Sequence, residues 1–441
     1  MKELDLSVEI LAEIIDNGVK FNDALKAKFQ NDVSIRPFRK DVAGLVGCEL
    51  RHDMLFAFLL KGFAWSEEEK RVASLLLANN FFYKHFPADM VKNAALEKLG
   101  EEKMAELADL LAKEGNPEAY VPENIKRGSL EYLSLRYNTP MWVLKIWEHF
   151  GYGIAYRVLR KNIRPKGVTL RVRNLPGLAE SVASSAEYLP TTVEGIVSYQ
   201  GKTPIRKVEF VKNGSLFEEK TAIKAILDQV KVSEPSEAFL FSDLKNDQAI
   251  KEFIESYGES IGLNVGVASL DNEHADAVRF IKEKKLRNVN LFASSADGFE
   301  ASISRPQDLV AVFAESTDFD AIRETPDFFV HCKPEMLDAL LERQKALLDG
   351  AAPFVALDGK LVYCVFTLSK KEGRNQVSEF IKTHGEFTLE KEEQIFPYDN
   401  LDVTCYYAIL KKGAPVEKAT PTIPEAALLA AAQPELRAEG E

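Results

Sequence analysis

Residues 308–381 begin DLVAVFAESTDFDAIRETPDFF and continue, from residue 343, as RQKALLDGAAPFVALDGKLVYCVFTLSKKEGRNQVSEFI. The runs at 309–313 and 361–366 are short and apolar, which is typical of buried strands. Each run is followed by a segment whose apolar residues have helical spacing. The stretch therefore predicts strand, helix, strand and helix in turn, the alternation of a mostly parallel sheet covered by helices.

The same alternation extends through the whole C-terminal half of the chain. We expect strands at 238–242, 263–269, 289–293, 309–313 and 361–366, helices at 246–258, 273–286, 334–349 and 373–384, and a closing pair of strands near 386–410. Such a run of units predicts one Rossmann-like sheet with helices on its faces.

The motifs in residues 308–381 resemble those of the Sun/Fmu, or RsmB-type, family of RNA cytosine carbon-5 methyltransferases. In that family an apolar strand ends in Asp-Ala-Pro-Cys, an Arg…Pro-Asp segment follows, and a Gly-Gly turn precedes a strand ending in Tyr-Ser-Thr-Cys-Thr. Here Arg323 and Pro326-Asp327 follow the first strand, Asp358-Gly359 stands at the turn, and Tyr363–Thr367 ends the second strand. The resemblance implies a methyltransferase-type domain and an RNA substrate.

The positions that resemble the reactive ones hold other residues. Carbon-5 of cytosine becomes nucleophilic only after a thiolate adds to carbon-6, and Phe366 stands at the position that resembles the nucleophile's. Ser316 resembles the second cysteine, and an alcohol without an adjacent base is a much weaker nucleophile. Phe313 resembles the aspartate that would hydrogen-bond the cytosine. The resemblance therefore implies a family member that lacks its catalytic residues.

Cys364 offers an alternative nucleophile. It lies two residues before Phe366, so on a strand the two side chains share a face. One interpretation is a displaced catalytic thiol, and the other is a small buried residue of the strand.

The cofactor positions have changed in the same way. The family binds S-adenosylmethionine with a Gly-rich turn after the first strand, but no glycine occurs between Gly214 and Gly258. Asp243 follows that strand, and Asp271 lies one residue from the position of the ribose-binding acid. Asp297 matches the adenine-side aspartate, although it also suits an Asp-Gly turn. We expect no cofactor, with S-adenosylmethionine bound if the chain is active.

The composition is that of a folded multidomain protein. The chain has 441 residues, 46% of them hydrophobic and 28% charged, and a formal net charge of −12. No apolar run reaches the roughly 18 residues needed to cross a bilayer. The cysteines show no metal-ligand spacing. They are Cys48, Cys332, Cys364 and Cys405. We expect a reduced, cytoplasmic monomer without a metal site, which does not associate with membranes.

A basic stretch interrupts this acidic chain. Residues 150–179 contain no acid, and Tyr152 and Tyr156 are interleaved with their cations. The cations of the stretch are Arg157, Arg160, Lys161, Arg164, Lys166, Arg171 and Arg173, and Arg206 and Lys207 follow it. Cations bind phosphates and aromatic rings stack on unpaired bases, so the pattern predicts contact with RNA. The alternative is a solvated basic surface.

The N-terminal third is predicted to be helical. Ser66 and Glu69 form a capping box, and the order of elements around Leu45–Arg51 resembles a NusB-type RNA-binding domain. Arg51 is then a candidate RNA contact, or it pairs with a neighbouring acid. The Tyr-x-x-Pro-x-Trp pattern at Tyr137–Trp142 resembles the family's linker helix.

The whole chain thus predicts a multidomain α plus α/β protein. The expected parts are a NusB-like helical domain at 1–125, linker helices at 126–162, a small α+β RNA-recognition subdomain at 163–215, a Rossmann-like methyltransferase-type domain at 216–412 and a disordered tail at 413–441. We expect an RNA-binding, catalytically inactive member of the family that acts on small-subunit rRNA. The alternatives are an active methyltransferase that uses Cys364 and a protein-interaction scaffold.

Overall fold

The computed structural model describes residues 1–30, 32–113, 120–162, 167–230, 237–244, 247–258, 261–267, 274–293, 303, 305–317, 325–398, 401 and 403–414. Of the site residues expected from the sequence, Arg164, Lys166, Asp271 and Asp297 lie outside these ranges. The same holds for residues 415–441, which make up almost all of the expected tail.

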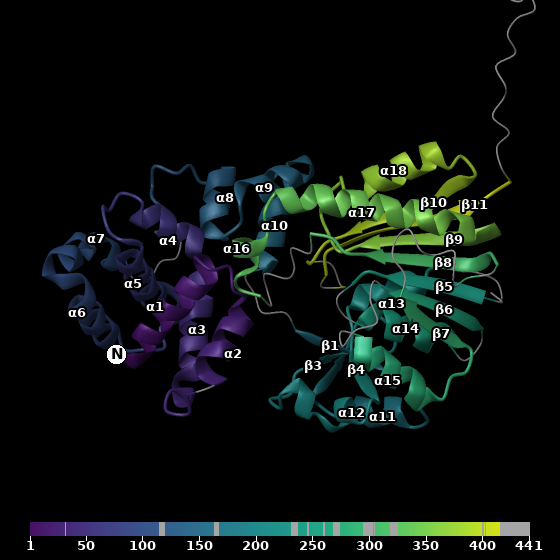
Figure 1. The fold of residues 1–441 in the computed structure, drawn as a ribbon, viewed down its shortest axis with the longest axis horizontal. Coiled ribbons are helices and arrows are strands. Elements are labelled where there is room, and N and C mark those ends of the chain that lie inside the picture. The colour runs from purple at the N-terminus through teal and green to yellow at the C-terminus, as the bar shows by residue number, and fades with distance from the viewer. Residues whose placement is uncertain are drawn as a thin grey trace, which may run out of the picture.

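The N-terminal part of the chain is helical, as the sequence predicts (Figure 1). Its capping box is present, since the Ser66 hydroxyl accepts a hydrogen bond from the Glu69 amide while the Glu69 carboxylate accepts one from the Ser66 amide. One hydrophobic core joins these helices to the linker helices that follow. The helices are α1 (Lys2–Ile15), α2 (Phe21–Gln30), α3 (Arg39–Leu50), α4 (Asp53–Leu60), α5 (Glu67–Ala78), α6 (Ala88–Glu106), α7 (Ala108–Leu111), α8 (Leu130–Arg136), α9 (Met141–Trp147) and α10 (Tyr152–Asn162).

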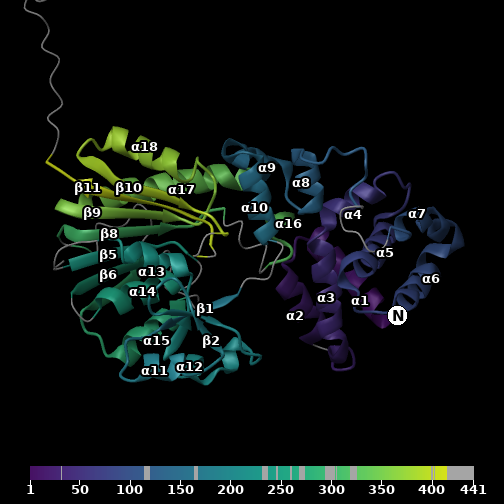
Figure 2. The ribbon, with the colours of Figure 1, turned by 180° about the vertical axis from the view of Figure 1, so that it is seen from behind.

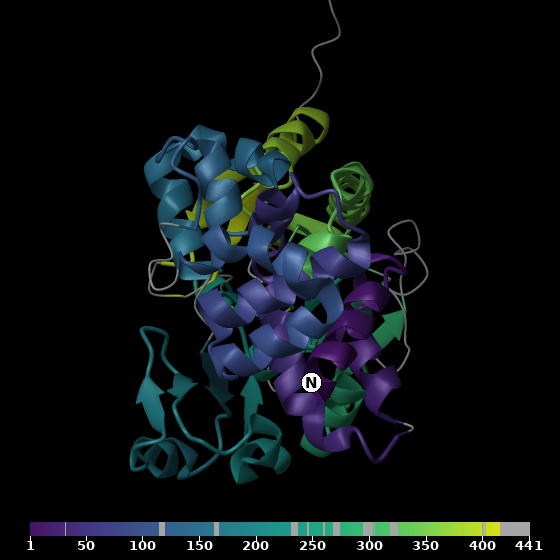
Figure 3. The same cartoon turned by 90° about the vertical axis from the view of Figure 1, so that its left-hand side faces the viewer.

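A small antiparallel sheet follows α10 and projects to one side of the helical region (Figure 3). Its described strands, in spatial order, are β2 (Tyr188–Pro190), β3 (Ile196–Tyr199), β1 (Val168–Val172) and β4 (Leu216–Glu218), and α11 (Leu178–Ala183) and α12 (Glu209–Lys212) accompany them. The expected boundary at residue 215 is wrong, because β4 pairs with β1 through Arg171 and Phe217 and so belongs to this sheet.

The large sheet confirms the predicted Rossmann-like class. Within the described residues its strand order is β10-β11-β9-β8-β5-β6-β7, in which the run from β9 to β7 is parallel and β10 and β11 are antiparallel. The strands are β5 (Glu237–Ser242), β6 (Gly262–Val267), β7 (Val289–Ala293), β8 (Gln307–Ala314), β9 (Val355–Val365), β10 (Phe387–Ile395) and β11 (Cys405–Lys412).

Helices cover both faces of this sheet (Figures 1 and 2). Alternate residues of β8 point to opposite faces, so Phe313 packs with α14 and α15 while Val312 packs with α17 and α18. The helices are α13 (Thr221–Leu227), α14 (Gln248–Tyr257), α15 (Ala275–Lys284), α16 (Phe328–His331), α17 (Glu335–Ala351) and α18 (Arg374–Thr383). Burial on both faces explains why the central strands β5 and β8 are nearly continuous apolar runs.

Asp358 and Gly359 lie within β9 and not in a turn before it. Asp358 has a φ of +61°, and the pairing of β9 with β8 shifts its register at this point. A side chain at Gly359 would place its Cβ 2.9 Å from the Ala356 carbonyl oxygen and 3.1 Å from that of Asp308. The backbone therefore requires glycine at this bulge.

The carboxyl ends of the parallel strands face the helical region. Helices α8, α9, α10 and α16 lie between the N-terminal helices and this edge of the sheet (Figure 1). The Asp327 carboxylate accepts a hydrogen bond of 2.8 Å from the amide of Phe21, which connects the segment after β8 to the start of α2. Within the described residues, no helix is both long and apolar enough to cross a membrane.

Candidate functional site at the carboxyl edge of the large sheet

The predicted catalytic positions meet at one edge because of strand register. Phe313 pairs with Ser242 of β5 on one side and with Cys364 of β9 on the other. Residues that follow β5, β8 and β9 are therefore close together in space, as in any parallel sheet whose strands end at a common edge.

Phe313 and Phe366 fill the edge with hydrocarbon. They are 0% and 1% exposed, and both belong to the core between the sheet and α14. The ammonium nitrogen of Lys220 lies 4.0 Å from the centre of the Phe366 ring. Neither ring has an atom that can attack a base or accept its proton.

Cys364 lies on the same face of β9 as Phe366, as its position in the sequence predicts. It is 0% exposed, and its sulfur lies 3.4 Å from that of Cys405, another free cysteine. A substrate base has no access to a thiol at this position, so the structure favours the buried-residue interpretation.

Ser316 is half-buried just beyond the end of β8, and the polar residue after it is fully enclosed. The Thr317 amide donates a 2.8 Å hydrogen bond to Glu372, and its hydroxyl lies 3.0 Å from that of Thr367. Thr367 in turn donates to Glu372 over 2.9 Å. This Thr317–Thr367–Glu372 network joins the ends of β8 and β9.

The network was not evident from the sequence. Glu372 follows two lysines and precedes a glycine, a context typical of an exposed turn, yet it is 0% exposed. Its backbone oxygen accepts a 2.7 Å hydrogen bond from the Tyr363 hydroxyl, and its carboxylate accepts one of 3.2 Å from Gln344 on α17. A buried carboxylate persists only with such partners, and here they come from three separate elements.

Asp243, a candidate cofactor residue, follows β5 and is bound by another side chain. Both of its carboxylate oxygens accept hydrogen bonds from the guanidinium of Arg343 on α17, and its amide donates a 2.9 Å hydrogen bond to the Phe313 carbonyl. Asp243 is 7% exposed, and the hydrogen bonds that Arg343 donates to its carboxylate raise the pKa of the arginine. Each carboxylate oxygen is therefore already bound to Arg343.

Asp247 is a second carboxylate at this edge that the sequence did not single out. It lies 2.7 Å from Nδ1 of His274, and its other oxygen accepts a 2.7 Å hydrogen bond from the Ala277 amide. An aspartate thus occupies the positive N-terminal end of α15, where an anionic ligand group could otherwise bind.

These residues do not fit S-adenosylmethionine. No glycine lies between β5 and α14 to allow close backbone approach, and Asp243 and Asp247 are held by Arg343, His274 and the backbone. No group of His, Cys, Asp and Glu side chains in the described part of the chain is arranged to hold a metal ion.

The candidate RNA-binding cations fall into two groups. Arg157, Arg160, Arg206 and Lys207 are exposed, and Lys161 is half-buried. Arg51 is half-buried as well, donates a 3.2 Å hydrogen bond to the Gly47 carbonyl, and has its pKa lowered by burial. These residues come from α3, α10 and the segment before α12.

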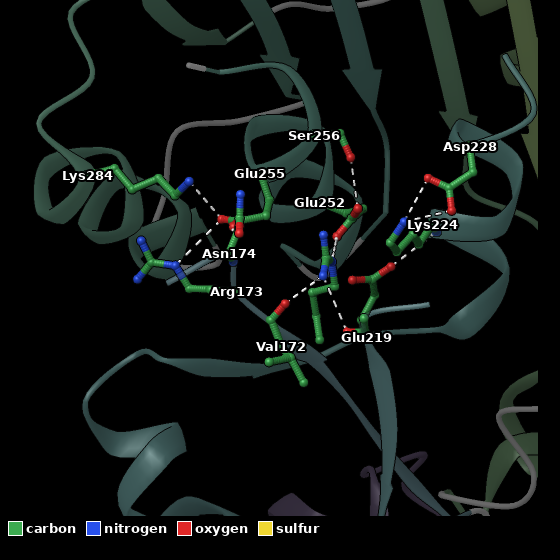
Figure 4. Close-up of polar contacts among 12 residues, drawn as sticks. Val172, Arg173, Asn174, Glu219, Lys224, Asp228, Glu252, Glu255, Ser256 and Lys284 are labelled. Carbon is green, nitrogen blue, oxygen red and sulfur yellow. Dashed lines mark hydrogen bonds and ion pairs between the residues drawn. The ribbon is translucent and has the colours of Figure 1, made fainter. Parts of the chain in front are cut away.

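Arg171 and Arg173 require a correction, because they are structural cations and not free surface ones. Arg171 Nε donates a 2.8 Å hydrogen bond to Glu252 on α14, and the two side chains are 12% and 0% exposed. Arg173 Nε lies 3.5 Å from Glu255 of the same helix, with side chains 11% and 2% exposed (Figure 4). Both arginines attach β1 to α14, so their charges are used inside the protein.

Glu219 completes this group of charges (Figure 4). It is 2% exposed and accepts a 3.1 Å hydrogen bond from the Lys224 amide. Burial and the neighbouring Glu252 raise its pKa well above the ordinary value. Two buried carboxyl groups, Glu219 and Glu252, thus lie near Arg171 at the joint between the small sheet and the large domain, and Glu252 forms the ion pair.

Comparisons with known proteins agree with this architecture. Residues 281–405 match the family model described as 16S rRNA methyltransferase RsmB/F. The chain is 24% identical over 427 residues to the "Probable ribosomal RNA small subunit methyltransferase B" of Bacillus subtilis (strain 168), which covers 89% of this chain and 92% of that protein. It is 26% identical over 113 residues to the ribosomal RNA small subunit methyltransferase F of Serratia proteamaculans (strain 568), covering 25% of this chain and 24% of the relative.

Solved structures share the fold. The crystal structure of PH0851 superposes with a TM-score of 0.66 at 16% identity, covering 92% of this chain and 97% of that one. NSun6 from Pyrococcus horikoshii, in a crystal structure with SFG, has a TM-score of 0.50 at 13% identity and covers 62% of this chain and 98% of its own. Residues 281–405 thus match the RsmB/F family of 16S rRNA methyltransferases, a relative of nearly full length is named as a methyltransferase of the same class, and the solved structures share the fold.

Proposed function

We propose that this chain is a catalytically inactive member of the family that binds structured RNA, namely small-subunit rRNA. The observation that carries the proposal is the burial of Phe366 and Phe313, at 1% and 0% exposure, where the family resemblance implies a thiolate and a base-binding aspartate. Hydrocarbon at both positions removes the nucleophile and the hydrogen bond that would hold the base.

Two further features support the loss of catalysis. The Asp243–Arg343 pair and the Asp247–His274 contact use carboxylates at the edge where the cofactor would bind. Ser316 is the hydroxyl that resembles the second cysteine, and Cys364, the fallback nucleophile, is fully buried against Cys405.

RNA binding needs none of these groups. Phosphate neutralisation, stacking and shape recognition are sufficient to position RNA, and exposed arginines on α10 and before α12 can supply the charge. The names of the relatives, both ribosomal RNA small subunit methyltransferases, support rRNA as the ligand. The proposal includes a NusB-like helical module at 1–125, a monomeric state and a cytoplasmic location.

Calorimetric titration with S-adenosylmethionine tests the first half of the proposal. We expect no binding tighter than about millimolar, because side chains and not glycines line the turn after β5. Incubation with labelled cofactor and small-subunit rRNA should give no incorporation above background. Micromolar affinity, or labelling that is lost in Cys364→Ala and kept in Cys332→Ala, would refute the inactive state.

Binding to a hairpin from small-subunit rRNA tests the second half. Affinity should fall steeply with added salt, since each phosphate contact releases counterions. A wild-type chain that binds no RNA at low salt would favour the protein-interaction scaffold.

A further inference from the structure

Aromatic rings and a guanidinium from two distant parts of the chain lie close together beside the carboxyl edge. We call Tyr152, Tyr156 and Arg157 of α10, together with Tyr398 from the segment after β10, the aromatic–arginine platform. The guanidinium carbon of Arg157 lies 3.8 Å from the centre of the Tyr398 ring. The rings of Tyr152 and Tyr156 are nearly parallel, at 11° with centres 6.2 Å apart.

The platform is anchored on one side and open on the other. Tyr156 and Tyr398 are half-buried and pack against the core of the helical region. Phe396 stacks on Tyr398 at 3° with a centre distance of 5.3 Å. Tyr152 is 39% exposed and Arg157 is also exposed. The guanidinium carbon therefore lies over a ring that is packed against the core, while the Arg157 side chain remains accessible to solvent.

Strand pairing shows why this surface lies at the functional edge. Ile395 at the end of β10 pairs with Cys405, and Tyr406 pairs with Val365 at the end of β9. The segment carrying Tyr398 therefore leaves the sheet beside Phe366. Helix α10 lies against this end of the sheet in both ribbon views (Figures 1 and 2).

The charge of the platform indicates its ligand. Residues 150–179 contain no acid although the chain as a whole carries a formal charge of −12. Flat aromatic and guanidinium faces stack on bases of any sequence, and nearby cations neutralise phosphates. In a paired A-form stem the base faces are already stacked, so this chemistry selects unpaired nucleotides.

We infer that the aromatic–arginine platform binds unpaired bases of the RNA by stacking, next to the site that has lost its chemistry. This inference rests on the proposed RNA binding and specifies which part of an RNA the chain holds. The platform would keep a loop or bulge beside Phe313 and Phe366 without modifying it.

The decisive variant is Arg157→Lys, which keeps the charge and removes the planar face. Its matched control is Arg160→Lys, the same change at an exposed arginine three residues further along α10. Tyr152→Leu tests stacking at a second position, because it removes an exposed aromatic ring without changing any charge. Thermal unfolding of each variant checks that the fold is retained.

Fluorescence anisotropy should compare two labelled RNAs, a short oligonucleotide of alternating adenine and cytosine, which cannot pair with itself, and a fully paired duplex. Arg157→Lys should weaken binding of the single strand about tenfold, as expected for the loss of one stacked base, and leave duplex binding unchanged. Tyr152→Leu should weaken the single strand similarly. Arg160→Lys changes a candidate phosphate contact, so any effect should be the same on both RNAs and the ratio of single-strand to duplex affinity should stay at the wild-type value.

The outcomes separate this inference from the proposed function. If the wild type binds the duplex but Arg157→Lys and Tyr152→Leu bind the single strand normally, stacking is refuted and RNA binding stands. Equal losses of single-strand affinity relative to duplex affinity in Arg157→Lys and Arg160→Lys would also refute stacking, because any arginine of α10 replaced by lysine would then have the same effect. If the wild type binds neither RNA, both the proposed function and the platform are rejected.

Discussion

Asp243 and Arg343 are 100 residues apart in the chain, and both oxygens of the aspartate accept hydrogen bonds from the guanidinium. The pair joins the end of β5 to α17 across the edge where the family resemblance implies a cofactor. It also connects the carboxyl ends of two strands, because the Asp243 amide donates to the carbonyl of Phe313.

Replacing Arg343 by Gln should destabilise the protein and should not restore cofactor binding. The substitution removes charge-assisted hydrogen bonds from an aspartate that is 7% exposed. The free energy of unfolding should therefore fall by roughly 1.5–3 kcal/mol. Urea denaturation measures the change, and Asp243→Asn with Arg343→Gln completes a double-mutant cycle. A coupling energy near zero would show that the two side chains do not depend on each other. Cofactor binding gained by Arg343→Gln would show that the arginine alone blocks the site.

Replacing Arg171 of β1 should lower the stability of the fold much more than replacing an exposed arginine. Arg171→Ala leaves Glu252, which is 0% exposed, without its ion-pair partner and should lower the free energy of unfolding by about 3–5 kcal/mol. Arg160→Ala changes an exposed side chain and should cost about 0.5 kcal/mol or less. Chemical denaturation of the two variants is the measurement, and equal stabilities would contradict the assignment of Arg171 to the fold.

The bulge in β9 predicts that Gly359 tolerates no side chain. Gly359→Ala forces a methyl group to within 2.9 Å of the Ala356 carbonyl oxygen, which is backbone and cannot move aside. We expect a loss of about 1–3 kcal/mol in the free energy of unfolding. Gly385→Ala is the control, because nothing lies within 4 Å of the added methyl there. If both variants unfold at the same denaturant concentration, the bulge does not restrict this position.

Glu49 predicts a pH dependence of stability in the helical region. Burial and the neighbouring Asp53 raise its pKa to about 8, whereas the unfolded chain has a glutamate pKa of about 4.3. Between these values the folded state keeps a proton that the unfolded state has released, so the contribution of Glu49 to stability is complete below about pH 4 and is lost as the pH rises to about 8.

Glu49→Gln removes this titration while it keeps the shape of the side chain. The stability of the wild type relative to Glu49→Gln should fall by a few kcal/mol from about pH 4.5 to about pH 9, and then level off. Guanidinium denaturation across this range, with both proteins in the same buffers, gives the difference directly. A difference that is independent of pH would mean that Glu49 titrates normally in the folded protein.

Much of the C-terminal fold was readable from the sequence. The run at 289–293 is β7 residue for residue, and the run at 238–242 matches β5 to within one residue. These predictions work because a parallel strand is a short, mostly apolar run and the helix that follows it has a period of 3.6, both of which are local properties. The Ser66 capping box was predictable for the same reason, since its two partners are three residues apart.

The state of the candidate site was only partly readable. The sequence shows phenylalanines at 313 and 366, the positions that resemble the reactive ones, and it shows no glycine after β5 before Gly258. The partners of Asp243, Arg171 and Glu372 are not visible, because each lies on an element far away in the chain. Because the sequence shows only that Arg171 and Arg173 are cations, they were predicted to bind RNA, although both pair with carboxylates of α14.

The sequence by itself thus determined the order of strands and helices along the chain and the residue types at the candidate site, because hydrophobic period and residue identity are properties of single segments. Only the tertiary structure decided which charges remain exposed, where Tyr398 meets Arg157, and which carboxylates are buried. The physical reason is that ion pairing and burial depend on contacts between distant segments. A charge has the same identity in the sequence whether it faces water or a partner 81 residues away.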